Sequence, residues 1–439
     1  MKLKINKVIY GSIPGALALT SALHWAVPIA IGIVSAASVV ILYIPQITIA
    51  IFFYGLPLVK AFLFADRVLL SLLILSILGI LTIIAIKFHG KIVLPKIDWF
   101  QILLFILIVW VLTTLLWTPN YERGIHKWRL WIITCVFPLE LIIIMARSNL
   151  KLKNIPEYSV YIGILLLIIS YITLRTNTFS PLQRFNVEGS DWNYARSLGF
   201  LLLTCVWLFD KSCLWKKILL IVISMISVYF LIKAATRAPF FTALFLAAVY
   251  LLFFSKVKIS IKIITVLLLF SAAVYLLSGS YLFLRIVGLK HSIELSSSIR
   301  LTIFEYATRN LSKIPPWGIG AGGFHIFLPQ LLKYILHPHN SLLEMFIETG
   351  IIGFSIYIIL MIIFPIYVAV RYLINIYNHT VSRNPLLEYA LLIWLFGFTN
   401  DLINDALASG RYEWISLGFL YSIIFVNKNN EQKRKNEQS

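Results

Sequence analysis

Apolar stretches of about 17 to 25 residues recur from one end of the chain to the other, each long enough to cross a bilayer as a helix. A helix also satisfies its own backbone hydrogen bonds, which the hydrocarbon core requires. The pattern therefore predicts an all-α polytopic membrane protein with about 12–14 transmembrane helices. The candidate spans are residues 8–24, 27–44, 47–64, 67–87, 99–117, 127–146, 156–174, 194–210, 216–233, 238–254, 263–279, 342–370, 386–405 and 412–426.

Composition supports a membrane protein. The chain is 60% hydrophobic and 13% charged, which lies outside the range of soluble globular domains. Its three cysteines lie in or beside apolar stretches without the spacing of metal ligands or disulfides. The basic start MKLKINK precedes an apolar stretch without a convincing cleavage site before the next span, so we expect an uncleaved first helix.

The formal net charge of +20 is distributed as in a membrane protein rather than a nucleic-acid-binding protein. If the N-terminus is cytoplasmic, alternation of the spans brings the basic clusters of the short loops to the same side. Those clusters are Lys87/Lys91/Lys96, Arg147/Lys151/Lys153, Lys211/Lys216/Lys217, Lys256/Lys258/Lys262, Arg371/Arg383 and the tail from Lys428 to Lys435. We therefore expect a multi-pass inner-membrane protein with both termini in the cytoplasm. Residues 8–66 carry little charge between their spans, which leaves 12 and 14 helices both open.

One long loop divides the chain. We expect N-terminal transmembrane helices over 1–279, a periplasmic loop over 280–340 that contains short helices, C-terminal transmembrane helices over 341–427 and a basic cytoplasmic tail over 428–439. The loop carries six lysines and arginines against two acidic residues, and four of the eight histidines. A basic outer loop suggests an anionic ligand, although these cations could instead meet lipid headgroups or solvent.

The sequence HPHNSLLEMFIETGIIGF, residues 337–354, begins a span beside this loop. Asn340 and Ser341 are both good N-cap residues, so His339 is expected at a helix N-terminus on the outer face. Histidine is well suited to accept and return a proton near neutral pH, and the helix N-terminus attracts anions. The alternative is an interfacial histidine without a catalytic role.

Two arginines are further candidates. Arg237, in AATRAPFFTALF, lies at the outer end of two spans, and its guanidinium could bind a phosphate through two hydrogen bonds or extend to lipid headgroups. Arg300 lies in a predicted surface helix, Ser298 to Leu311, where we expect it to face a cleft. Gly318, Gly320, Gly322 and Gly323 follow in a turn that we expect to let backbone approach the membrane.

More polar residues are expected at the outer face. They are Arg184, Glu188, Asp191, Asn193 and Arg196 before one span, and Asp401, Asp405, Arg411 and Glu413 at the last outer turn. They could contact sugar hydroxyls, whereas for the carboxylates we favour capping and ion pairing. Paired metal ligands, a Walker loop and a nucleophile elbow are missing from the sequence, so we expect no metal and no cofactor.

These patches resemble the O-antigen ligase and O-antigen polymerase superfamily. The ligase motif is His, then Asn, Ser or Gln, nine residues, Gly, two residues, and Gly, Thr or Tyr, and His339, Asn340, Gly350 and Gly353 match it fully. The family's R-x-x-x-L motif maps to Arg237, with Phe241 where leucine is expected. The segment with Arg300 and the turn at Gly318 and Gly320 looks like the family's loop helix. The likeness is specific over about 180–360, and elsewhere concerns topology alone.

The resemblance implies a metal-independent transfer of a glycan from an undecaprenyl-diphosphate carrier. By this analogy Arg237 and Arg300 hold the diphosphate, and His339 orients or deprotonates the acceptor hydroxyl. Arg184, Asn193, Asn340, Gly318 and Gly320 are the further candidates for substrate binding. Membrane lipids are the other expected partners, and neither a nucleotide nor a nucleic acid is expected.

The resemblance leaves the acceptor open. A ligase uses a sugar of lipid A–core, which we favour because the His-Asn motif fits in every position, whereas a polymerase uses another carrier-linked repeat unit. A non-enzymatic lipid-linked glycan transporter is a third possibility, although transporters usually place their ionisable groups near the bilayer midplane and often contain internal repeats. Transfer of the glycan to a protein is a fourth.

Overall fold

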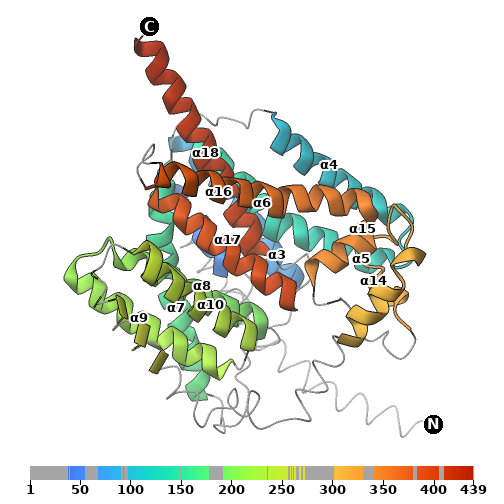
Figure 1. The fold of residues 1–439 in the computed structure, drawn as a ribbon, viewed down its shortest axis with the longest axis horizontal. Helices are drawn as coiled ribbons and strands as arrows, with labels where there is room; N and C mark the ends of the chain where they lie inside the picture. Colours follow the sequence, from blue (N-terminus) through green and yellow to red (C-terminus); the bar gives the residue numbers. More distant parts are fainter. Residues whose placement is uncertain are drawn as a thin grey trace, which may run out of the picture.

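The computed structural model describes residues 40–54, 68–89, 97–148, 150–176, 191–234, 236–255, 301–329, 340–378, 383–404 and 410–438, with isolated positions at 38, 92, 258, 260, 262, 263, 266, 267, 270, 271 and 338. Every regular element in these ranges is a helix, which confirms the predicted all-α class (Figure 1). A turn at Pro45 separates two short helical pieces, 40–43 and 47–54, at the place where the sequence predicted a turn.

The helices of the first half follow the predicted spans closely. They are α3 (Val68–His89), α4 (Trp99–Thr113), α5 (Tyr121–Trp131), α6 (Phe137–Arg147), α7 (Ile155–Thr176) and α8 (Asp191–Phe209). A π-helical turn, Ile132–Val136, joins α5 to α6, so the predicted span 127–146 begins earlier than expected, at Tyr121. Helix α4 begins where Asp98 accepts hydrogen bonds from the amides of Phe100 and Gln101, and α5 begins where Asn120 accepts one from Arg123.

The second half continues the alternation of helices and short turns. Its elements are α9 (Leu214–Lys233), α10 (Arg237–Val249) with a π turn at Tyr250–Phe254, α14 (Phe324–Phe327), α15 (Ser341–Ile358), a π turn at Ile359–Ile363, α16 (Phe364–Tyr377), α17 (Pro385–Asn404) and α18 (Arg411–Gln438). The predicted span 342–370 is thus part of a continuous run from Ser341 to Tyr377.

The centre of the molecule is formed by α6, α8, α17 and α18. Helix α18 packs against α17 and α6, and α8 packs against α9 and α10. Small residues allow these approaches, since a side chain on Gly199 would meet the Phe396 ring, and one on Gly418 would meet the Leu139 backbone. The buried rings of Trp131 and Trp414 meet edge to face at 5.3 Å.

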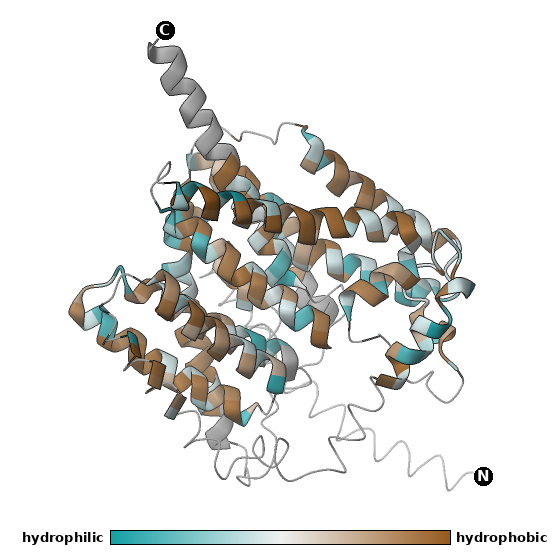
Figure 2. Cartoon of the chain, viewed as in Figure 1, coloured by the Kyte–Doolittle hydropathy of each residue, from teal (hydrophilic) through white to brown (hydrophobic). Residues whose placement is uncertain are grey.

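The outer surface of the helices is apolar, as expected of a protein surrounded by lipid. Figure 2 shows hydrophobic residues along the helices, with hydrophilic residues gathered at helix ends and around α5 and α14. Large apolar side chains such as Phe105, Phe245 and Tyr367 are more than half exposed. Among the described residues, seven helices are long and apolar enough to cross a membrane by length and composition. The chain is therefore a polytopic helical membrane protein, and its total of 12 or 14 spans stays a prediction.

The described part of the long loop packs on the first half of α15. Residues 301–309 are helical, within the predicted helix from Ser298 to Leu311, and Ile303 and Ala307 on one face are buried. They join Phe324 of α14 in an apolar cluster with Leu343 and Ile347 of α15. This cluster holds residues 301–329 against the helix that carries the motif (Figure 1).

Candidate active site

Helix α15 begins where the sequence predicted. Asn340 is its N-cap, and its side-chain oxygen accepts a hydrogen bond from the amide of Leu343 at 2.9 Å. The amide nitrogen of the same side chain donates to the carbonyl of Leu402, near the end of α17, at 3.0 Å. One asparagine therefore both starts α15 and ties that start to α17. His339, which directly precedes Asn340 in the sequence, lies outside the described residues.

The first motif glycine, Gly350, breaks α15. Its φ of 66° and ψ of −166° belong to a region that is essentially accessible to glycine alone. At the break, the amide of Ile351 donates to Pro316 at 2.9 Å, while Ile319 and Gly320 donate to the carbonyls of Ile347 and Glu348. The glycine turn thus pairs its backbone with the interrupted helix. Gly350 is required because the turn docks there.

The other turn glycines approach the connection between α4 and α5. A Cβ on Gly320 would lie 2.5 Å from the Cα of Thr118, and one on Gly322 would lie 2.7 Å from the amide nitrogen of Gly124. Both have positive φ, 96° and 76°. The structure brings this turn against protein backbone, whereas its approach to the membrane stays a prediction. Glycine is needed in this turn because α15 and residues 118–124 both contact its backbone.

The last motif glycine, Gly353, lies against α4. A side chain there would collide with Thr349 and with the Trp110 ring. The Trp110 indole donates to the carbonyl of Thr349 at 2.8 Å. Gly353 therefore lets α4 approach the second half of α15. The two motif glycines serve packing. Gly350 lies at the opposite end of the first half of α15 from Asn340, ten residues or roughly 15 Å along its axis.

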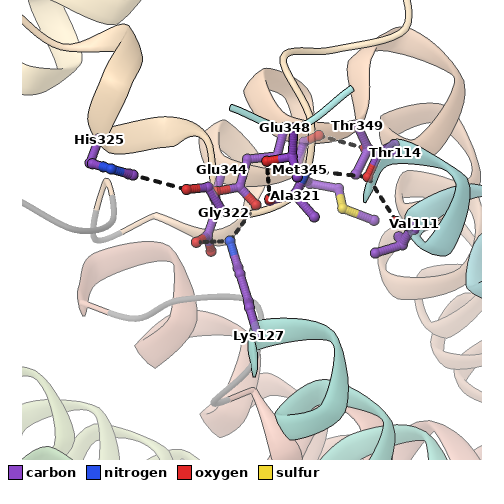
Figure 3. Close-up of polar contacts among 11 residues, drawn as sticks. Val111, Thr114, Lys127, Ala321, Gly322, His325, Glu344, Met345, Glu348 and Thr349 are labelled. Carbon is purple, nitrogen blue, oxygen red and sulfur yellow. Dashed lines mark hydrogen bonds and ion pairs between the residues drawn. The ribbon is translucent and has the colours of Figure 1, made fainter. Parts of the chain in front are cut away.

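Between these two ends lies a charged cluster that sequence reasoning missed (Figure 3). Lys127 of α5 forms ion pairs with Glu344 and Glu348, one turn apart on α15. The Lys127 side chain is 14% exposed and the two carboxylates are 1% and 4% exposed, so one ammonium group pairs with two carboxylates away from solvent. Arg123, one turn earlier on α5, also interacts electrostatically with both carboxylates. Two glutamates spaced i, i+4 in an otherwise apolar span were the available signal.

Arg237 is the first residue of α10 and is partly buried. Ala243 of α10 lies beside Gly199 of α8, and the two helices run in the same direction because short turns join both of them to α9. Arg237 therefore lies at the level of Asn193, each six residues before this contact. Phe241, which departs from the family's pattern, is 50% exposed, so the departure does not disturb the core.

A buried network connects the ends of α8, α17 and α18 at this level. Arg196 forms an ion pair with Asp401, as expected for the carboxylates in this region. Arg411 donates to the side chain of Asn193 at 3.4 Å and to the carbonyl of Phe53 at 3.1 Å. The structure thus brings the predicted residue Asn193 together with Arg411, for which sequence reasoning had left contact with sugar hydroxyls and helix capping both open.

Asn193, Arg237 and Asn340 therefore lie near the ends of α8, α10, α15 and α17. The motif glycines and the turn glycines lie elsewhere, where the turn contacts α15 and the connection between α4 and α5. Arg184, Arg300, His339 and Asp405 lie outside the described residues, and their roles stay predictions. Within the described ranges, three or more histidine, cysteine, aspartate or glutamate side chains do not gather in a group able to hold a metal ion.

A family model described as O-antigen ligase matches residues 222–358, from within α9 to the end of α15. The match contains Arg237, the glycine turn and the whole His-Asn motif. No curated protein matches the chain. Over residues 222–358 the chain is therefore similar to the O-antigen ligase family.

Proposed function

We propose that this protein is an O-antigen ligase. It transfers a glycan from an undecaprenyl-diphosphate carrier to lipid A–core, at the periplasmic face of the bacterial inner membrane. The family match supports a glycosyltransferase-like enzyme of the ligase or polymerase kind. The main support for the proposal is that Arg237, Asn193 and Asn340 lie at about the same height in the helix bundle, where several helices begin or end.

This arrangement suits an anionic, sugar-bearing substrate. The starts of α8, α10 and α15 contribute backbone amide groups and the positive ends of their helix dipoles, which favour phosphate groups. Arg237, at the start of α10, has a guanidinium that can hold a phosphate through two parallel hydrogen bonds. Asn193 is an amide of the kind that binds sugar hydroxyls.

The proposed chemistry needs two kinds of assistance. A diphosphate leaving group requires stabilisation of its developing charge, which Arg237 and Arg300 would supply. A sugar hydroxyl is a poor nucleophile, and His339 would orient or deprotonate it. Asn340, beside His339 in the sequence, would keep the start of α15 tied to α17. Arg184, Gly318 and Gly320 remain candidates for contact with the glycan. The bond energy already stored in the donor makes a nucleotide unnecessary, and we expect no metal.

The alternative is an O-antigen polymerase, which would use the same diphosphate site and a second carrier-linked repeat unit as acceptor. The family match does not distinguish the two activities. We favour the ligase because the His-Asn motif of that family fits at His339, Asn340, Gly350 and Gly353. A transporter is less favoured, because Arg237 and Asn193 lie at helix ends rather than at mid-span.

Deletion of the gene in the source bacterium separates these functions. A ligase mutant should produce lipid A–core without long-chain glycan, and should accumulate polymer on the carrier lipid. A polymerase mutant should instead produce lipid A–core with a single repeat unit. Both glycolipid pools would be extracted and separated on gels. Complementation with wild-type protein and with Arg309→Ala, an exposed arginine paired with Glu305, should restore the profile. Unchanged glycan in the deletion mutant would exclude both transferases.

A further inference from the structure

Four charged side chains are buried where α8, α17 and α18 meet. Arg196, Asp401, Arg411 and Glu413 are each no more than 2% exposed. Arg196 pairs with Asp401. The hydrogen bonds of Arg411 reach neutral oxygens, including the carbonyl of Phe53 at 3.1 Å and the hydroxyl of Tyr412 at 3.2 Å. A buried charge is costly unless it is paired, so the protonation state of each carboxyl group affects the stability of this cluster.

The two carboxyl groups face each other. A Cβ built on Gly410 would lie 2.5 Å from Asp401 Oδ2 and 2.7 Å from Glu413 Oε1, so both groups converge on the same glycine. Asp401 Oδ2 and Glu413 Oε2 are both buried, and neither has a hydrogen-bond partner among the other groups. A hydrogen bond between the two side chains would satisfy both atoms. A hydrogen bond between two carboxyl groups needs a proton, because two carboxylates offer only acceptors and repel each other.

The surroundings indicate which group carries that proton. Asp401 has the positive partner, Arg196, and is therefore the ionised member of the pair. Glu413 instead accepts a hydrogen bond from the hydroxyl of Tyr357 at 2.9 Å, a neutral partner. With Glu413 protonated, one of its oxygens accepts from Tyr357 and the other donates to Asp401. Every buried group in this pair is then satisfied.

This network reaches the helix start that carries the motif. The hydroxyl of Tyr357 lies 3.5 Å from the hydroxyl of Ser341, the first residue of α15. Asn340, the preceding residue, is held separately by the carbonyl of Leu402, next to Asp401. The start of α15 is thus tied to the end of α17 through two routes, of which one passes through the carboxyl pair.

We propose that Glu413 is a positioning residue held as a neutral carboxylic acid, which donates to Asp401 and sets the start of α15 through Tyr357 and Ser341. Its effect on transfer rests on the proposed function, whereas its charge state does not. Glu413 acts through Tyr357, so it orients the motif without contact with the substrate. The carboxamide of glutamine has the same shape as a protonated carboxyl group, with a donor on one side and an acceptor on the other. Glutamine should therefore replace Glu413 without loss of this arrangement.

The charge state is tested by infrared spectroscopy on the purified full-length protein. The carbonyl stretch of a protonated carboxyl group is distinct from the absorption of a carboxylate. The difference spectrum of wild type and Glu413→Gln should show the loss of one protonated carboxyl. A difference spectrum without that band would overturn the proposal. This measurement needs no substrate, so it remains decisive even if the protein proves not to be a glycan transferase.

The positioning role is tested by transfer from a purified undecaprenyl-diphosphate-linked glycan to lipid A–core. Glu413→Gln should keep the wild-type maximal rate. Tyr357→Phe, which keeps the ring and removes the link to Ser341, should lower the maximal rate by roughly 10- to 100-fold, since misplacement by about 1 Å can cost 10²-fold. The donor concentration for half-maximal rate should stay unchanged in both. A Glu413→Gln variant as slow as Glu413→Ala, or a fully active Tyr357→Phe, would show that the network does not position the site.

Discussion

Gly318 and Gly350 lie backbone against backbone, each with a positive φ, of 80° and 66°. A Cβ on either residue would fall within 3.0 Å of backbone atoms around the other, closer than real Cβ contacts. Since backbone cannot move aside as a flexible side chain can, this contact joins the long loop to the motif helix at a position where only glycine fits.

Gly350→Ala should therefore detach residues 301–329 from α15. The backbone strain alone costs about 1–3 kcal/mol, and the collision adds to it. We expect a lower unfolding temperature and faster proteolysis within 301–329 in detergent-solubilised protein. Ile351→Ala, at a neighbouring position that is 48% exposed, is the control and should behave as wild type. Equal proteolysis of Gly350→Ala and wild type would contradict the docking role.

Lys127→Met should destabilise the protein. It leaves Glu344 and Glu348 buried without their cation, and removal of one partner from a buried ion pair typically costs about 3–5 kcal/mol. Unfolding of the purified protein by heat or denaturant measures the change. The matched control is Lys216→Met, because the pair of Lys216 with Glu157 is largely exposed and should contribute less than about 1 kcal/mol.

A second set of variants separates charge from packing at the same site. If unpaired charge causes the loss, then adding Glu344→Gln and Glu348→Gln to Lys127→Met should recover part of the stability. No recovery in this triple variant would indicate that the methylene chain of Lys127 matters more than its charge.

Arg237→Ala and Arg300→Ala should each abolish transfer while expression remains normal. Lysine at either position should restore activity only in part, because an ammonium group lacks the planar fork that binds phosphate through two hydrogen bonds. Complementation of the deletion strain measures both, with Arg309→Ala as the active control. Full activity of Arg237→Lys together with Arg237→Ala would remove the diphosphate role of Arg237.

His339→Ala should lose transfer and still bind the carrier lipid. Removal of a general base typically lowers a rate by about 10²–10⁴-fold, whereas diphosphate recognition would rest on the arginines. His337→Ala is the control, and we expect it to keep substantial activity. The assay uses purified protein with defined donor and acceptor, in the presence of a chelator. Wild-type rates in His339→Ala, or activity abolished by the chelator, would contradict the proposed mechanism.

Both termini should be cytoplasmic, and residues 280–340 should be periplasmic. The distribution of lysine and arginine among the short loops gives this orientation. Reporter fusions at Lys290 and after Lys435 should therefore give signals from opposite compartments. Signals from the same compartment at both positions would require a different number of spans between them.

Much of the architecture is determined locally. Apolar stretches of the right length predicted the helices at 68–89, 99–113, 214–233 and 385–404 within a few residues, because a helix in lipid satisfies its own backbone. Asn340 predicted the start of α15, because an N-cap acts on amides two or three residues away. The motif around it was also recognisable from spacing alone, and the family match agrees.

Only the tertiary structure decided which polar groups meet. Lys127 and Glu344 are 217 residues apart, and Arg196 and Asp401 are 205 residues apart. Hydropathy and capping patterns depend on near neighbours, so they predict neither pair. The break at Gly350 likewise depends on a turn more than thirty residues earlier in the chain. Helices form through hydrogen bonds between near neighbours, whereas buried charges are stable only when packing brings a distant partner to them.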